Sequence, residues 1–309
     1  MRARTLVAIL ISCAAAGAQD RPPRRIIDVH LHAEPSDDPR FGTTWTSPLT
    51  GRVMTAARDE PTQMSASLEA MQRLNIVKAV VSADQPEALR RWKERAPDRV
   101  IVGYGFDDLD KVDLAFLRRE HAAGRLHVIG EIAVQYGGAA PDDPRLEPVY
   151  ALAEELDVPL ALHLHPGPPG APYPPFGMSR MRARNGRPLL LEEPLVRHPK
   201  LRLYVMHAGW PFLDEMKALL YAHPQVYVDL GVIDWSQPAP EFHRYLRGLV
   251  EAGYGKRILF GTDQMVWPQM MDVAVAAVES ADYLTAEQKD DIFYNNAVRF
   301  LRLEPANQP

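Results

Sequence analysis

Five side chains with metal-ligand chemistry stand directly after short apolar runs of the sequence. They are His30, His32, His163, His207 and Asp263. Imidazole and carboxylate groups are the ligands that Zn²⁺, Mn²⁺ and Fe²⁺ accept at an open site. A metal held there lowers the pKa of a coordinated water molecule to about 7, which supplies hydroxide near neutral pH. One histidine after a strand is usually structural, but this repeated placement predicts a divalent-metal site.

The rest of the chain alternates between strand-like and helix-like segments. Apolar, often β-branched runs predict strands at 26–29, 76–81, 100–104, 128–133, 160–162, 201–205, 226–230 and 258–260. Helical apolar spacing recurs between them, at 64–74, 146–156, 212–221 and 242–250. Eight such strands predict a single α/β domain, a (β/α)8 barrel of the TIM type. A doubly wound open sheet is the alternative, but it normally carries a glycine-rich loop after its first strand, where this chain has His-Leu-His.

The predicted strands bring the candidate ligands to one place. His30 and His32 are two residues apart at the end of the first predicted strand, so their side chains point to the same face. His163 and His207 follow the fifth and sixth predicted strands, and Asp263 follows the eighth. The carboxyl ends of barrel strands form the active-site rim. The candidate ligands are therefore expected to converge at the barrel mouth.

Two long loops and a terminal helix complete the predicted domain. Residues 34–61 and 166–188 do not fit the strand–helix repeat, and loops of this length are usually functional. Residues 285–303 predict a helix with Thr285 as its N-cap, which we expect to close the base or side of the barrel.

Several polar and aromatic side chains are candidates for substrate binding. The second loop carries Tyr173, Arg182 and Arg184, and the planar guanidinium fork suits a carboxylate or phosphate. These arginines either anchor an anionic substrate or form an ordinary solvated basic loop. Trp210, Trp235 and Trp267 each follow a strand end and either line an aromatic pocket or pack in the core.

The amino terminus has the order of a secretory signal peptide. Arg2 and Arg4 precede an apolar stretch at 6–11, and Ala-Gly-Ala at 16–18 forms a cleavage site. Residues 1–18 are therefore expected to be removed, leaving a secreted or periplasmic domain at 19–309. The apolar stretch is shorter than the ~20 residues that a membrane-spanning helix needs. Cys13 also stands in a sequence that resembles a lipoprotein-processing box, so lipid anchoring there is the alternative.

Composition narrows the class of partner. The chain of 309 residues has a net charge of −5 and no long run of Lys or Arg, unlike a nucleic-acid-binding protein. Its one cysteine lies in the predicted signal peptide, so a metal site in the mature chain must consist of His and carboxylate groups. A small-molecule substrate is the expected partner, and a homo-oligomer is left open.

The strand-end motifs resemble those of the amidohydrolase superfamily, specifically the amidohydrolase-related family 2. They are Ile-Asp-Val-His-Leu-His at 27–32, Gly-Glu-Ile at 130–132, Pro-Leu-Ala-Leu-His at 159–163, Val-Met-His-Ala-Gly-Trp-Pro at 205–211 and Leu-Phe-Gly-Thr-Asp at 259–263. They occur in the family's order, and the resemblance covers nearly the whole mature chain. It implies a TIM barrel that binds one or two divalent ions, zinc in the first place, with manganese or iron as alternatives.

The resemblance also implies a role for each candidate. The metal ligands would be His30, His32, His163 and Asp263. Asp263 would also accept a proton from the attacking water, and His207 would either bind the metal or polarise the substrate beside it. His165 falls where relatives often have glycine, so His163 is preferred over it as the ligand.

Glu131 resembles a glutamate that helps to hold a second metal in the deoxyribonuclease branch of the superfamily. The alternative is that Glu131 pairs with an arginine or orients a histidine from behind the ligands.

The activity implied by the resemblance is hydrolysis of a small-molecule lactone, ester or amide by metal-activated water. The alternative is a non-oxidative decarboxylase acting on a carboxylated small molecule, because that branch of the family shares the ligand set. A non-catalytic periplasmic binding protein is a remote alternative. The complete ligand set argues against it.

Overall fold

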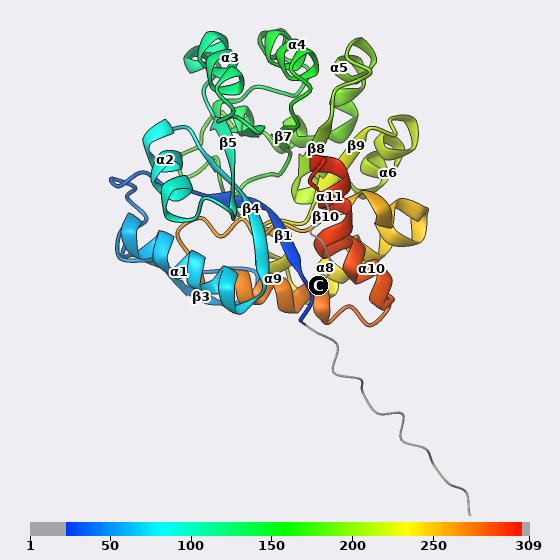
Figure 1. Cartoon of the computed structure of the whole chain (residues 1–309). Coiled ribbons are helices and arrows are strands. Elements are labelled where there is room, and N and C mark those ends of the chain that lie inside the picture. The colour runs from blue at the N-terminus through cyan, green and yellow to red at the C-terminus, as the bar shows by residue number, and fades with distance from the viewer. Residues whose placement is uncertain (1–22, 305–309) are drawn as a thin grey trace, which may run out of the picture.

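Eight parallel strands form a barrel in the computed structural model, which describes residues 23–304 (Figure 1). In their order around the sheet they are β1 (Ile26–His32), β4 (Ile76–Ala83), β5 (Val100–Phe106), β6 (Val128–Ile132), β7 (Leu160–His163), β8 (Leu203–Met206), β9 (Val226–Asp229) and β10 (Ile258–Leu259). The barrel closes where the Val29 amide donates to the Phe260 carbonyl at 2.9 Å and the Asp263 amide donates to the His30 carbonyl at 2.7 Å. The predicted signal peptide at 1–18 lies outside the described residues.

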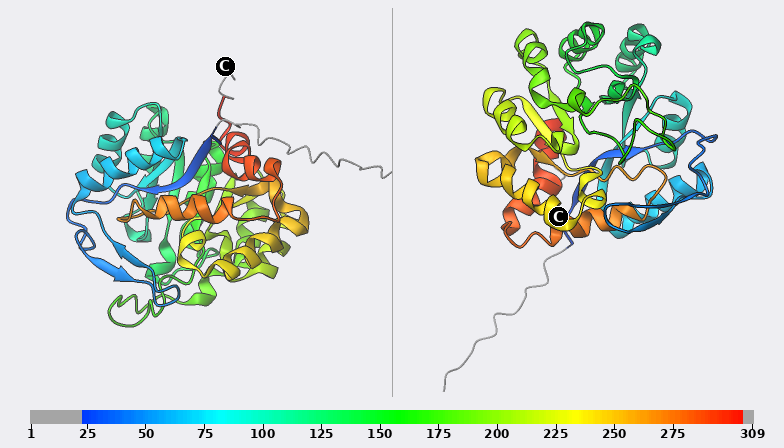
Figure 2. Two further views of the ribbon diagram at one scale, coloured as in Figure 1. Left: turned by 90° about the horizontal axis from the view of Figure 1, so that it is seen from below. Right: turned by 180° about the vertical axis from the view of Figure 1, so that it is seen from behind.

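Helices connect the strands and surround the barrel (Figures 1 and 2). The main ones are α1 (Glu60–Arg73), α2 (Pro86–Arg95), α3 (Leu114–Ala122), α4 (Glu147–Glu155), α5 (Glu192–Arg197), α6 (Leu213–Ala222), α8 (Ala239–Leu249) and α9 (Met270–Glu279). The short α7 (Ile233–Ser236) follows β9. The predicted (β/α)8 fold is confirmed. No helix of residues 23–304 is both long and apolar enough to cross a membrane.

The first strand carries an irregularity that positions the predicted ligands. Asp28 pairs with Ala79 and Leu31 pairs with Val81. Between these two pairs β1 has one more residue than β4, which is a β-bulge in β1. Ile27 and Val29 belong to the inner apolar cluster of the barrel, whereas Leu31 packs in the outer cluster against the helices. The extra residue turns His30 to the inner side together with Val29, because a bulge changes the alternation of side chains.

The long loop at 34–61 contains an element that the sequence did not indicate. A small antiparallel hairpin forms from β2 (Thr44–Thr46) and β3 (Val53–Thr55). Its strands are three residues each, too short for a period of two to be visible in the sequence. The loop at 166–188 contains only isolated turns before residue 183, as expected.

The predicted terminal helix at 285–303 is interrupted. Thr285 caps it as expected, in a capping box with Gln288. The helix then divides into α10 (Ala286–Asp290), a widened turn at 291–295 and α11 (Asn296–Leu301). The side-chain amide of Asn296 donates to the carbonyls of Gly255 and Ile258, which fixes α11 to the start of β10.

The end of α11 closes one end of the barrel. Ala297 and Phe300 join the inner apolar cluster, and the Phe300 ring packs on Tyr204 and Tyr227. Arg202, which precedes β8, donates to the Phe300 carbonyl, so this plug lies at the amino ends of the strands. The opposite, carboxyl ends are left for the candidate site.

Candidate metal centre

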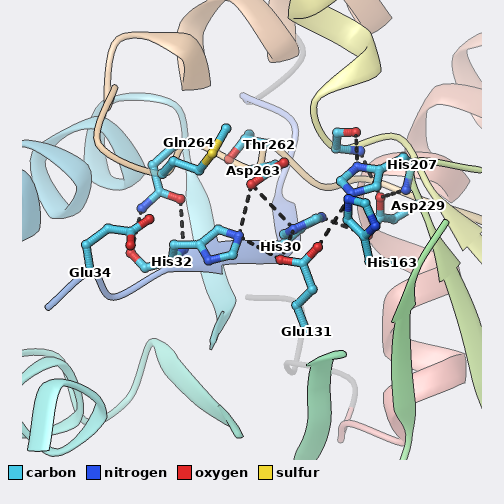
Figure 3. A network of polar contacts seen from close by, with 12 residues as sticks. His30, His32, Glu34, Glu131, His163, His207, Asp229, Thr262, Asp263 and Gln264 are labelled. Atoms are coloured by element: carbon cyan, nitrogen blue, oxygen red, sulfur yellow. Dashed lines mark hydrogen bonds and ion pairs between the residues drawn. The ribbon is translucent and has the colours of Figure 1, made fainter. Parts of the chain in front are cut away.

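The carboxyl ends of the strands bring together five side chains with ligand chemistry (Figure 3). His30 and His32 come from β1 and Glu131 comes from β6. His207 directly follows β8, and Asp263 stands four residues after the end of β10. They form two overlapping groups, His30–His32–Asp263 and His30–Glu131–His207, in each of which one ligand atom per residue lies within 4.8 Å of the others. Glu131, which the sequence left between two roles, thus lies inside the cluster.

The shortest contacts in the cluster join the two carboxylates to the histidines. His32 Nε2 lies 2.9 Å from Asp263 Oδ1 and 3.2 Å from Glu131 Oε2. His30 Nε2 lies 3.5 Å and 3.6 Å from the same two oxygens. His207 Nε2 lies 3.6 Å from Glu131 Oε1. Glu131 therefore uses both of its oxygens to link the first strand to the loop after β8.

The chemistry of this donor set fits a divalent cation. The Nε2 atoms of His30, His32 and His207 are buried and make no hydrogen bond within the described residues. Buried polar atoms nearly always have a hydrogen-bond or ligand partner. Three such nitrogens around two carboxylates therefore indicate a binding partner that they share. His and carboxylate groups at these positions suit Zn²⁺, Mn²⁺ or Fe²⁺.

The opposite ring nitrogens are held so that Nε2 faces the cluster. His30 Nδ1 donates to Asp229 Oδ2 at 3.1 Å, and His207 Nδ1 donates to the Gly231 carbonyl at 2.8 Å. These bonds place the proton on Nδ1 and leave the Nε2 lone pair free for a metal. Asp229 Oδ1 in turn accepts from the amides of His207 and Gly231.

Two residues behind the ligands were missed by the sequence analysis. Asp229 is the last residue of β9, and its position at a strand end is the signal that could have identified it. Gly231 leaves room for the His30 ring, because a Cβ at this position would lie 2.6 Å from His30 Nδ1. Such a close approach permits only glycine.

The protonation of the cluster follows from its burial and its pairing. Burial alone would raise the pKa values of Glu131 and Asp263, but the imidazole of His207 beside Glu131 and that of His30 beside Asp263 hold both pKa values below their ordinary range. Burial lowers the pKa of His32, yet the close contact with the Asp263 carboxylate prevails and raises it to about 10. Both carboxylates are therefore ionised at neutral pH and available to a cation.

His163 lies beside the cluster with both ring nitrogens hydrogen-bonded. Nδ1 is 3.0 Å from Gln135 Oε1, and Nε2 is 3.0 Å from the Tyr136 hydroxyl. The Gln135 amide nitrogen donates to the His165 carbonyl, so Oε1 accepts from Nδ1 and the tyrosine donates to Nε2. The structure thus places His163 4.6 Å from His207, ring to ring, with its lone pair in use. Its role as a ligand stays a prediction.

Gln135 and Tyr136 were also missed by the sequence analysis. Both belong to the single turn at Val134–Gly137 after β6, which has no periodic pattern to reveal it.

His165 is held in the tautomer that does not suit a metal. Its Nδ1 accepts a hydrogen bond from the Gly167 amide at 3.1 Å, so the proton resides on Nε2. Burial and the neighbouring His207 lower its pKa well below the ordinary value, which keeps the ring neutral. The ring lies between Trp210, stacked at 5.4 Å, and His207 at 5.2 Å.

The arginines proposed for substrate binding lie elsewhere. Arg182 and Arg184 line a hollow of about 690 Å³ together with Arg180, and none of the five clustered residues lines it. Tyr173 is 69% exposed. The structure does not bring these side chains to the cluster.

The tryptophans are divided between the core and the site. Trp267 is buried and packs against Trp45 and Trp235. The Trp210 indole donates to Glu241 and stacks on His165, and its backbone amide donates to the His207 carbonyl at 3.0 Å.

A cavity of about 150 Å³ opens beside His32 and Glu131. The ends of β1, β4, β5 and β6 line it, and its charged residues are Glu34, Asp84, Asp107 and Glu131. The cavity therefore adjoins the cluster at His32 and Glu131.

The sequence matches the amidohydrolase family over residues 27–303, which spans every strand of the barrel and all five clustered residues. The chain belongs to the amidohydrolase family. Its members depend on metal, which agrees with the donor set of this chain. No curated protein matches the chain at a significant level.

Solved structures similar to this chain include both hydrolases and decarboxylases. A probable 2-pyrone-4,6-dicarboxylic acid hydrolase from Acinetobacter baumannii has 14% identity and a TM-score of 0.63, over 90% of this chain and 100% of that one. An amidohydrolase from Burkholderia multivorans with bound zinc has 19% identity and a TM-score of 0.61, over 91% and 100%. 2,6-Dihydroxybenzoate decarboxylase from Rhizobium has 17% identity and a TM-score of 0.59, over 92% and 99%. At these identities the likeness establishes the barrel fold.

Proposed function

We propose that this chain is a metal-dependent hydrolase of a small-molecule lactone, ester or amide. The observation that carries the proposal is the cluster of three buried imidazole Nε2 atoms, which make no hydrogen bond within residues 23–304, around two ionised carboxylates beside a cavity. Zinc is the first choice for the metal, because a neighbour of the same fold is described with bound zinc.

The clustered residues have two roles, metal binding and proton transfer. His30, His32, Glu131, His207 and Asp263 would hold one or two ions. A divalent ion in this position supplies Lewis acidity and makes water nucleophilic near neutral pH. The Asp263 carboxylate, kept ionised by its histidine neighbours, accepts a proton from the attacking water and returns it to the leaving group. Asp229 and Gly231 keep His30 and His207 in the required tautomers.

The charge of the cavity favours hydrolysis over decarboxylation. A decarboxylase must bind a carboxylate, and apart from the metal no Lys or Arg side chain would meet it, because none is among the described residues that line the cavity. The nearby Arg40 is already paired with Glu34 and Asp38, at 2.7 Å and 2.6 Å. Decarboxylation remains the second candidate because a decarboxylase is among the structural neighbours.

A metal assay and a substrate screen test the proposal together. We expect the purified protein to contain about one or two equivalents of divalent metal by elemental analysis, in line with open catalytic sites. Lactones, aryl esters and anilides should be hydrolysed with net addition of water, and a chelator should abolish turnover until metal is restored. Full activity of metal-free protein would overturn metal dependence. CO₂ release from aromatic carboxylates, with no hydrolysis, would instead select the second candidate.

We also propose that the enzyme is exported, because residues 1–18 have the order of a signal peptide. Amino-terminal sequencing of protein from the native host should begin at Gln19. A lipid on Cys13, detected by mass spectrometry, would instead support the anchored form.

A further inference from the structure

We propose that the cavity beside the metal cluster selects substrates that carry a cationic amino group, which Ser82, Asp84 and Asp107 bind. The inference rests on the proposed hydrolase for the reaction that follows binding. It concerns the side of the cavity formed by β4 and β5, away from the ligands themselves.

Two carboxylates of this subsite lack a partner. Asp84 directly follows β4 and Asp107 directly follows β5, and these adjacent strands are paired up to Ala83 and Tyr104. Both aspartates line the cavity. Among the described residues, neither side chain makes a hydrogen bond or an ion pair, whereas the exposed Glu87 on α2 pairs with Arg90. Their charges are therefore free to act on a ligand.

A buried hydroxyl in the same cavity gives a second, independent indication of a ligand. Ser82 is 2% exposed, lines the cavity, and its Oγ has no hydrogen-bond partner within residues 23–304. A buried hydroxyl without a partner costs free energy, so its retention indicates a partner that arrives with the substrate. Gly103 on β5 leaves room for it, since a Cβ there would lie 2.9 Å from Ser82 Oγ.

The combination of charges and acceptors identifies the class of ligand. Glu34 also lines the cavity, but Arg40 neutralises it at 2.7 Å, and Asp38 occupies the same guanidinium group. The unpaired charges on this side are thus negative. A primary ammonium group offers a positive charge and three N–H donors, which match two carboxylates and one hydroxyl. A substrate carboxylate would be repelled there.

The position of the subsite fits the proposed reaction. His32 and Glu131 line the same cavity as Ser82, Asp84 and Asp107. A small amine-bearing substrate can therefore place its amino group between β4 and β5 while its carbonyl group reaches the cluster. The cavity of about 150 Å³ restricts this to a short spacer between the two groups.

Three closely related anilides test the inference. The 4-nitroanilides of 3-aminopropanoate, butanoate and succinate differ only in an ammonium, methyl or carboxylate group at the same place. We expect kcat/KM to be about 10-fold higher for the 3-aminopropanoyl anilide than for the butanoyl anilide, and lowest for the succinyl anilide. Equal values, or a preference for the succinyl compound, would overturn the inference.

Variants of the subsite assign the preference to these residues. The double variant with Asp84→Asn and Asp107→Asn should reduce the ratio of kcat/KM for the 3-aminopropanoyl anilide to kcat/KM for the butanoyl anilide to about 2 or below. The reason is that it removes both unpaired charges. Ser82→Ala should lower the same ratio less. Asp98→Asn is the matched control, since Asp98 is an exposed aspartate before the amino end of β5, and its ratio should equal that of the parent. An unchanged ratio in the double variant would reject the assignment.

A binding measurement separates failure of this inference from failure of the proposed function. If no anilide is hydrolysed, the hydrolase proposal fails, and calorimetry with 3-aminopropanamide and butanamide decides the subsite. Tighter binding of 3-aminopropanamide, lost in the double variant, supports the inference. Equal binding of the two amides overturns it.

Discussion

His32 and Asp263 meet across the seam where the barrel closes, with His32 Nε2 2.9 Å from Asp263 Oδ1. Two further interactions join the first and last barrel strands around this contact. The Asp263 amide donates to the His30 carbonyl, and the Gln264 side chain accepts from the His32 amide and donates to the His32 carbonyl. Asp263 has a φ of 50°, a conformation that costs free energy for a residue other than glycine. The seam thus holds Asp263 in a position that its own backbone disfavours.

Asp263→Asn should abolish most of the turnover while leaving the fold intact. The amide cannot accept a proton from water, and general base catalysis is typically worth a factor of 10² to 10⁴. We expect kcat to fall by about 10³, measured with the best substrate of the screen, with an unchanged circular dichroism spectrum. Asp272→Asn, on the exposed face of α9, is the control and should retain parent activity. A kcat within a few-fold of the parent in Asp263→Asn would exclude this aspartate as the base.

The hydrogen bond between Tyr136 and His163 can be used to test whether His163 is a ligand. A metal can bind His163 Nε2 only if the Tyr136 hydroxyl, now 3.0 Å away, releases it. If His163 is a ligand, we expect His163→Gln to weaken metal binding by about 10 to 100-fold, while Tyr136→Phe binds metal at least as tightly as the parent. Competition with a fluorescent chelator measures both affinities. Parent affinity in His163→Gln would remove this residue from the ligand set.

Asp234 should make the protein less stable as pH rises. Both of its carboxylate oxygens are buried without a hydrogen bond within the described residues. Burial, reinforced by repulsion from Asp28, raises its pKa well above the ordinary value. Between about pH 4, the unfolded pKa, and the raised folded pKa, the folded protein therefore binds more protons than the unfolded chain, and its stability falls with increasing pH.

Asp234→Asn removes this titration and should raise Tm at pH 8. A gain of about 1 kcal/mol in the free energy of unfolding raises Tm by roughly 2–4 °C in a large domain, and we expect this increase in Tm to shrink toward zero near pH 4. Differential scanning calorimetry at both pH values measures the effect, with the exposed Asp110→Asn as the control. A Tm difference that does not depend on pH would contradict the prediction.

Phe300 should be essential to the closed end of the barrel. Its ring packs on Tyr204 and Tyr227, with centroids 5.6 Å and 4.7 Å away, and the side chain is almost fully buried. Phe300→Ala should lower the free energy of unfolding by about 3–5 kcal/mol, since it leaves a cavity. Phe300→Leu should cost less, and Val196→Ala, at an exposed position, should cost almost nothing. Urea unfolding measures all three, and a small loss in Phe300→Ala would mean that α11 does not close the barrel.

The sequence by itself determined the barrel and most of the candidate ligands. Each strand and helix carries its apolar pattern locally, so eight alternating repeats sufficed to predict a (β/α)8 barrel. The ends of parallel strands meet at one rim, which is why His30, His32, His207 and Asp263 could be placed together before any coordinates were known. The same reasoning identified the capping residue Thr285, because a capping box is a local signal.

Only the tertiary structure decided how the side chains at that rim are used. Whether Glu131 joins the cluster, which partners bond the two ring nitrogens of His163, and how Asp229 orients His30 depend on contacts between segments far apart in sequence. The loop at 166–188 carries its arginines to a separate hollow, because a loop without periodicity has no pattern from which its path can be inferred. The unpaired acidic side of the cavity likewise arises from two neighbouring strand ends, which become a binding surface only when the barrel brings them together.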